Sequence, residues 1–198
     1  VALDTLFDLL EVTERSDLRG MVLQDLERQR SALSALREHP QVSADVLDSM
    51  LAEISDAVAG MAGVGRIGQD LRDNDWLNSL RGRLAIPGGS SQVDMPSFYG
   101  WQMLSAEKRQ ADMNRWSAPF TPLYQALRLI LRILRGAGDV MDRVATAGSY
   151  QEMLGGKTFQ LLRVWVARHY EVFPEMSANK YVVLVRFAKQ DEEQKSAP

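Results

Sequence analysis

Apolar side chains recur with the 3.6-residue period of an amphipathic helix along the first two-thirds of the chain. The first such stripe consists of Leu3, Leu6, Phe7 and Leu10. A second helix is predicted from an N-cap at Ser16 to the pair His39-Pro40, because the residue before a proline disfavours helical backbone. A third helix is predicted from a cap at Ser43 to the glycine-containing region 60–65.

Capping residues predict more helices farther along the chain, at Asn74, Ser97, Ser105 and Thr121. Asn74 divides residues 66–84 into two short helices. Thr121 is followed by Pro122, a hydroxyl cap with proline at the first helical position, and the helix that it opens ends at Gly136. Because this helix is apolar around most of its circumference, we expect it in a core or in a subunit interface.

The apolar period changes from 3.6 to 2 after residue 136. Alternation over residues 161–167 and 181–188 predicts two strands, joined by residues 174–179, and residues 140–146 predict a weaker third strand. The sequence therefore predicts an α+β fold that is mostly α. We expect a helical domain over 1–136, a small antiparallel β domain over 137–189 and a disordered polar tail over 190–198.

Composition limits the chemistry that the chain can perform. Its 198 residues include no cysteine and two histidines, which excludes disulfides, thiol nucleophiles and cysteine zinc sites. The net charge of −3 gives no general attraction to nucleic acid or anionic lipid. No window approaches the roughly 20 apolar residues of a membrane span, and no signal peptide is recognisable. We therefore expect a cytoplasmic protein without metal or cofactor.

Two features that could indicate an enzyme have simpler interpretations. Residues 63–68 contain three glycines, but a dinucleotide-binding loop follows a strand, and a predicted helix precedes these residues. A flexible joint is the favoured interpretation. His39 precedes a proline at a helix end and His169 lies at a strand end, and no Gly-x-Ser-x-Gly motif is present. Catalysis is not expected.

Few side chains of this chain suit catalysis or metal binding, but several arginines are placed where they could bind an anion. Arg186 lies in the middle of one predicted strand, and Arg163 interrupts the other. A half-buried arginine needs a carboxylate partner, which can be internal or can come from an acidic or C-terminal peptide. Both interpretations stay open at this point. A stripe of arginines at 128, 132 and 135 is better explained as a solvated or interface face.

Several strings of residues carry a family resemblance. Early matches are Leu9-Leu10-Glu11-Val12, Glu14-Arg15, Leu18-Arg19 and residues 25–29. The most specific blocks lie within residues 66–72 and 83–89 and contain Arg66, Gly68, Gln69, Pro87, Gly88 and Gly89. Late matches are Leu161-Leu162-Arg163, Lys180 and Val185-Arg186-Phe187. On these motifs the chain resembles the ZapD family, the Z-ring-associated cell division proteins of bacteria.

This resemblance implies a non-enzymatic cytoplasmic protein at the mid-cell division site. Members of the family dimerise through a helical domain and carry a small β domain at each end of the dimer. Each protomer binds the C-terminal tail of FtsZ, so the homodimer crosslinks filaments without nucleic acid or membrane. Carried over by match, Arg15 and Arg186 are the first tail-binding positions, followed by Lys180 and Arg163.

The chain also departs from the family pattern. Family members begin with a further strand and a long helix before the position of Val1, and they end with another strand. Asp75, Tyr99 and Val182 stand where other members carry basic residues or histidine. Two other functions stay open beside the one that the resemblance implies. One is a small-molecule or phosphate-binding enzyme or sensor that uses residues 63–68 and Arg66, and the other is a structural helical domain that lacks its recognition strands.

Overall fold

The computed structural model describes residues 2–15, 17–87 and 91–189, with only the backbone of Arg15. The predicted cap Ser16, the motif residues Gly88 and Gly89 and the predicted tail 190–198 lie outside these ranges. The chain forms two compact units, one ending at Ile133 and the other beginning at Leu134. The separate folding of domains 1–136 and 137–189 stays a prediction.

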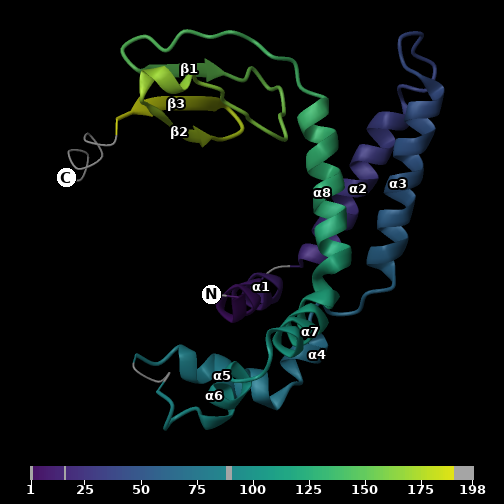
Figure 1. Cartoon of the computed structure of the whole chain (residues 1–198). Coiled ribbons are helices and arrows are strands. Elements are labelled where there is room, and N and C mark those ends of the chain that lie inside the picture. Colours follow the sequence, from purple (N-terminus) through teal and green to yellow (C-terminus); the bar gives the residue numbers. More distant parts are fainter. Residues whose placement is uncertain (1, 16, 88–90, 190–198) are drawn as a thin grey trace. The chain divides into compact units, whose positions relative to one another are not determined.

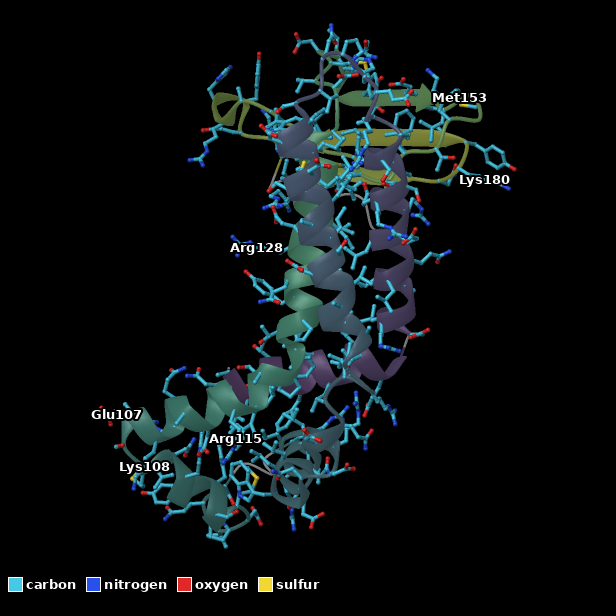
Figure 2. The ribbon with its side chains drawn as sticks, turned by 90° about the vertical axis from the view of Figure 1, so that its right-hand side faces the viewer. Glu107, Lys108, Arg115, Arg128, Met153 and Lys180 are labelled. Atoms are coloured by element: carbon cyan, nitrogen blue, oxygen red, sulfur yellow. The ribbon has the colours of Figure 1, made fainter. Side chains whose placement is uncertain are left out.

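The first unit is helical (Figure 1). Its elements are α1 (Ala2–Arg15), α2 (Leu18–Ser34), α3 (Ala44–Ala62), α4 (Gln69–Arg72), α5 (Asp75–Leu84), α6 (Pro96–Gln102), α7 (Ala106–Ser117), the 3₁₀ turn η1 (Ala118–Phe120) and α8 (Thr121–Gly136), whose end from Leu134 on belongs to the second unit. The long helices α2, α3 and α8 lie side by side in both views (Figures 1 and 2). Together with the sheet of the second unit, they confirm the predicted α+β class.

Most predicted helix starts are confirmed, but the caps predicted at Ser16, Ser97 and Thr121 are wrong. Helix α8 begins at Thr121 as predicted, yet Thr121 has helical backbone and follows directly on η1, so it lies within the helix and does not cap it. Asn74 caps α5 by accepting a hydrogen bond from the backbone of Leu77 at 3.0 Å. The N-cap of α2 is Asp17, whose carboxylate accepts from the backbone of Gly20 at 3.0 Å. Helix α6 begins at Pro96 and not after a cap at Ser97, since proline needs no acceptor for a backbone N–H at the first position.

The second helix ends at Ser34, five residues earlier than predicted. Residues 35–38 continue as tight turns, in which the backbone N–H groups of Leu36 and Arg37 bond three residues back. Leu36 is exposed, so the apolar stripe no longer packs against a neighbour there. Packing of an apolar face supplies most of a helix's stability, and the regular helix ends where that packing ends.

The core of the first unit is formed by leucine, isoleucine and methionine from several helices. Its most completely buried side chains are Leu10, Leu26, Ile54, Met61 and Leu77. Helix α8 contributes one face to this core, made of Leu123, Ala126, Leu129, Ile130 and Ile133. Of its other apolar residues, Tyr124, Leu127 and Leu131 are exposed, and Leu134 is half-buried. The helix is therefore half core and half surface.

The second unit holds a three-stranded antiparallel sheet in the order β1-β3-β2. The strands are β1 (Ser149–Met153), β2 (Phe173–Ala178) and β3 (Val182–Ala188). Arg186 on the central strand lies opposite Ser149 on one side and Glu175 on the other. The predicted strand 181–188 is confirmed as β3.

The other strand predictions are wrong. Residues 161–167 join no ladder, although exposure alternates over residues 163–167, because alternation indicates a half-buried surface and does not supply a pairing partner. Residues 140–146 form no strand beyond an isolated bridge from Thr146 to Ser149. The predicted connection 174–179 is instead strand β2 up to Ala178. Pro174 is tolerated there because β2 is an edge strand.

Candidate functional site

The C-terminal turn of α1 carries the predicted binding residue Arg15 and is held by two other arginines. The Glu14 carboxylate accepts a hydrogen bond from Arg72 Nε at 2.9 Å and pairs with Arg81 Nη2 at 3.4 Å. The hydrogen bond from Arg72 is the main cause that lowers the pKa of Glu14 below its ordinary value. Glu14 is thus ionised at neutral pH, and its charge is already compensated within the fold.

A polar hollow of about 380 Å³ lies beside this turn, where α1 passes into α2. Thr13, Glu14, Asp17, Arg19, Arg66 and Ile67 are among its lining residues. Arg19 donates to the carbonyls of Met61 and Ala62, both at 3.2 Å, and so caps the C-terminus of α3. Arg66 is exposed on the rim. The hollow is therefore lined by two arginines, Arg19 and Arg66, and by the Glu14 carboxylate, whose charge is compensated by Arg72 and Arg81.

Arg186 presents a second basic position, on the central strand of the sheet. Its Nε lies 3.7 Å from Oε2 of Glu175, and the two side chains are 52% and 45% exposed. An exposed ion pair of this kind contributes about 0–1 kcal/mol. This pair therefore adds little to the stability of the sheet.

Lys180 and Arg163 each lie over an aromatic ring. Lys180 lies just before β3, at the same end of the sheet as Met153 (Figure 2), and its ammonium is 4.8 Å from the Tyr181 ring centroid. The guanidinium of Arg163 is 4.3 Å from the Trp165 ring centroid, and its Nη1 donates to the Arg135 carbonyl at 3.0 Å. Arg163 thus lies outside any strand, and one of its guanidinium N–H groups is bonded to a carbonyl at the end of α8.

The structure brings only some of the four predicted residues together. Arg186 and Lys180 belong to one β2–β3 hairpin, and Arg163 belongs to the same unit. Arg15 belongs to the first unit, at the end of α1. A single pocket made from all four residues stays a prediction.

Three residues of the family motif, Arg66, Gly68 and Gln69, lie at the joint between α3 and α4. Gly68 has φ +72°, and a side-chain carbon there would lie 2.7 Å from Leu10 Cδ2. Gln69 donates to Asp73 at 2.8 Å, and Pro87 lies in an exposed turn after α5. Because α3 directly precedes residues 63–68, this joint lacks the strand–loop–helix arrangement of a dinucleotide site.

A cluster of aromatic rings was not foreseen from the sequence. Trp116 on α7 stacks on Trp76 of α5 at 5.6 Å and lies 5.8 Å from Trp101 of α6. The indole of Trp76 donates to Ser97, and that of Trp101 donates to Asp112 at 3.0 Å. Three of the four tryptophans fall within residues 76–116, a spacing that could have indicated a shared cluster.

The described residues contain no group of three or more acidic or histidine side chains that could hold a metal ion. None of the helices they form is long and apolar enough to cross a membrane. Fold and site together define a helix-rich α+β protein whose candidate binding positions are basic residues. Among them, Arg186 pairs with Glu175, and Lys180 and Arg163 each lie over an aromatic ring.

Comparison with known proteins identifies the family. A family model described as "ZapD: Cell division protein" matches residues 1–186, and the chain belongs to this family. It is 56% identical over 191 residues to the cell division protein ZapD of Bordetella petrii, covering 96% of this chain and 76% of that protein. The proteins of the same name in Bordetella pertussis and a Janthinobacterium species are 53% and 44% identical. Each alignment covers 98% of this chain, and 77% and 78% of the two relatives.

Proposed function

We propose that this chain is a non-enzymatic division factor that acts in the cytoplasm, at the mid-cell division site. As a homodimer, it binds the C-terminal tail of FtsZ with one basic site per protomer, and it crosslinks filaments to stabilise the Z-ring. The observation that carries the proposal is membership of the ZapD family across residues 1–186. The activity requires no metal, cofactor, nucleic acid or membrane.

The proposed tail-binding residues are Arg15 and Arg186, supported by Lys180 and Arg163. Guanidinium groups suit this task because their planar fork can bind a carboxylate through two parallel hydrogen bonds. The exposed pair of Arg186 with Glu175, at 3.7 Å, supports the proposal, since it demonstrates a carboxylate within reach of this guanidinium. Binding of a single tail is expected to be weak and to weaken further with salt.

The exposed face of α8 is the proposed dimer contact. Tyr124, Leu127 and Leu131 are 61%, 40% and 37% exposed and follow one another at helical spacing. A two-fold dimer uses the same patch on both protomers, so one apolar stripe is sufficient. Two weak sites on one dimer then gain strength through effective concentration when both engage a polymer.

Titration of a labelled FtsZ C-terminal peptide into the full chain tests tail binding, by fluorescence anisotropy at low and moderate salt. The double change Arg15→Glu and Arg186→Glu should weaken binding at least tenfold while leaving the helical circular dichroism unchanged. The matched control is Arg28→Glu with Arg37→Glu, which alters the net charge equally at two exposed positions on and after α2. Equal losses in both double variants would indicate general electrostatic attraction and contradict the assigned site.

Multi-angle light scattering and filament sedimentation test the dimer. The change Leu127→Asp with Leu131→Asp should give the mass of a monomer that still binds the peptide but no longer bundles filaments. If this variant stays dimeric, the exposed face of α8 is not the dimer contact. Failure of the well-folded parent dimer to bind the peptide would refute tail binding by this chain.

A further inference from the structure

Arg72, the last residue of α4, is an unusually buried arginine that joins two distant parts of the chain. Its side chain is only 9% exposed. Nε donates to Glu14 at 2.9 Å, and Nη2 donates to Thr13 Oγ1 at 3.0 Å and to the Leu10 carbonyl at 3.3 Å. Nη1 donates to the Ile67 carbonyl. One guanidinium therefore bonds the end of α1 to the joint that precedes α4.

The α1 acceptors of Arg72 all lie in the last two turns of the helix, directly before Arg15. A helix end frays unless its terminal groups find partners, because the last carbonyls have no intrahelical donor. The rigid fork of an arginine can hold several such groups in one geometry, and a lysine cannot. Arg72 thus fixes the backbone turn that ends at Arg15.

Arg72 also sets the charge of this turn. Glu14 is the immediate neighbour of Arg15, and an uncompensated carboxylate there would repel an acidic peptide. With Arg72 at 2.9 Å and Arg81 at 3.4 Å, the negative charge of Glu14 faces two positive charges. These two guanidinium groups therefore more than compensate the charge of Glu14.

We infer that Arg72 is a positioning residue for the binding of an acidic peptide: it holds the end of α1, and screens Glu14, so that Arg15 can engage a carboxylate. This inference rests on the proposed function, because it assigns a second role at the same site. Arg72 itself contacts no ligand, since its donors are used within the fold.

The test is a double-mutant cycle on the full chain with the labelled FtsZ tail peptide. Arg72→Gln should weaken binding by about tenfold, the size of a typical coupling between neighbouring groups. Arg15→Gln should weaken binding in the parent but by less than twofold in the Arg72→Gln background. Arg72→Lys keeps the charge without the fork and should behave like Arg72→Gln, and it serves as the milder variant where folding is impaired.

Arg81→Gln is the matched control, because Arg81 pairs with the Glu14 carboxylate, whereas Arg72 also donates to Thr13 Oγ1 and to the Leu10 carbonyl. It should weaken peptide binding clearly less than Arg72→Gln does, because it removes only part of the screening of Glu14 and leaves the bonds of Arg72 to α1 intact. Hydrogen exchange supplies a readout that does not depend on the peptide. In Arg72→Gln, the amides of residues 10–14 should exchange faster, while those of α3 keep the parent rate.

The outcomes separate the inference from the proposed function. Additive effects of Arg15→Gln and Arg72→Gln, or unchanged exchange at residues 10–14, would overturn the positioning role while tail binding stands. If the parent chain does not bind the peptide, the proposed function fails, and a role for Arg72 in binding fails with it. Non-additive binding with faster exchange at the end of α1 would establish the positioning role.

Discussion

Gly68 is the position where one added methyl group is expected to disturb the first unit most. Its backbone is left-handed, with φ +72° and ψ 21°. A side-chain carbon there would lie 2.7 Å from Leu10 Cδ2 and 3.3 Å from Phe120 Cζ, and both of these side chains are buried. Gly68→Ala therefore combines an unfavourable backbone conformation with a steric overlap in the core.

The two effects give the size of the expected loss. An L residue in the left-handed region costs roughly 1–2 kcal/mol. Forcing an extra carbon into a packed core costs about 1–3 kcal/mol, because neighbouring side chains must leave their preferred rotamers. We expect Gly68→Ala to lower the free energy of unfolding by about 2–5 kcal/mol, a large share of the roughly 5–15 kcal/mol of a typical domain.

Urea unfolding followed by far-ultraviolet circular dichroism measures this loss, with Gly60→Ala and Gly82→Ala as controls. These two glycines lie inside α3 and α5, and an added carbon meets nothing within 4 Å at either one. Both controls should gain about 0.5–1 kcal/mol, because alanine is the better helix former. A loss below about 1 kcal/mol for Gly68→Ala, or similar losses at all three positions, would refute the assigned strain and overlap.

Two further predictions concern a carboxylate and a helix cap. Because the hydrogen bond from Arg72 holds the pKa of Glu14 below 4.5, Glu14 stabilises the fold above that pH, and the contribution is lost as the pH falls through the lowered value. The Tm of the parent should therefore fall more steeply than that of Glu14→Gln below pH 4.5, and parallel curves would contradict the assignment. Asn74→Ala should cost about 1 kcal/mol in urea unfolding, because the side chain caps Leu77. Ser43→Ala should cost less than half as much, because Ser43 makes no side-chain cap bond, and equal costs would argue against the cap geometry.

The helices could be predicted from the sequence because their signals are local. Asn74 and the Thr121-Pro122 pair mark helix starts within a few residues of the backbone that they organise. The strands were predicted less well, because a strand depends on a partner that is distant in sequence. Residues 161–167 have the right alternation without a ladder, whereas residues 173–178 pair with β3 despite Pro174.

In the candidate site, too, features marked by neighbouring residues could be predicted, and contacts between residues far apart in the sequence could not. Arg186 could be singled out because a charged residue interrupts an apolar strand. The role of Arg72 could not be predicted, since its acceptors Leu10 and Glu14 lie 62 and 58 residues away. An ion pair between elements far apart in the chain leaves no periodic pattern in the sequence.

The distribution of tryptophan gives each unit its own optical signal. Trp76, Trp101 and Trp116 are close enough for their excited states to couple, and they report on the helical unit. Trp165 is 62% exposed in the other unit, beside the guanidinium of Arg163, and should emit at longer wavelength. Emission at the blue and red edges of the spectrum, recorded in one denaturant titration, would then follow the two units separately without any added label.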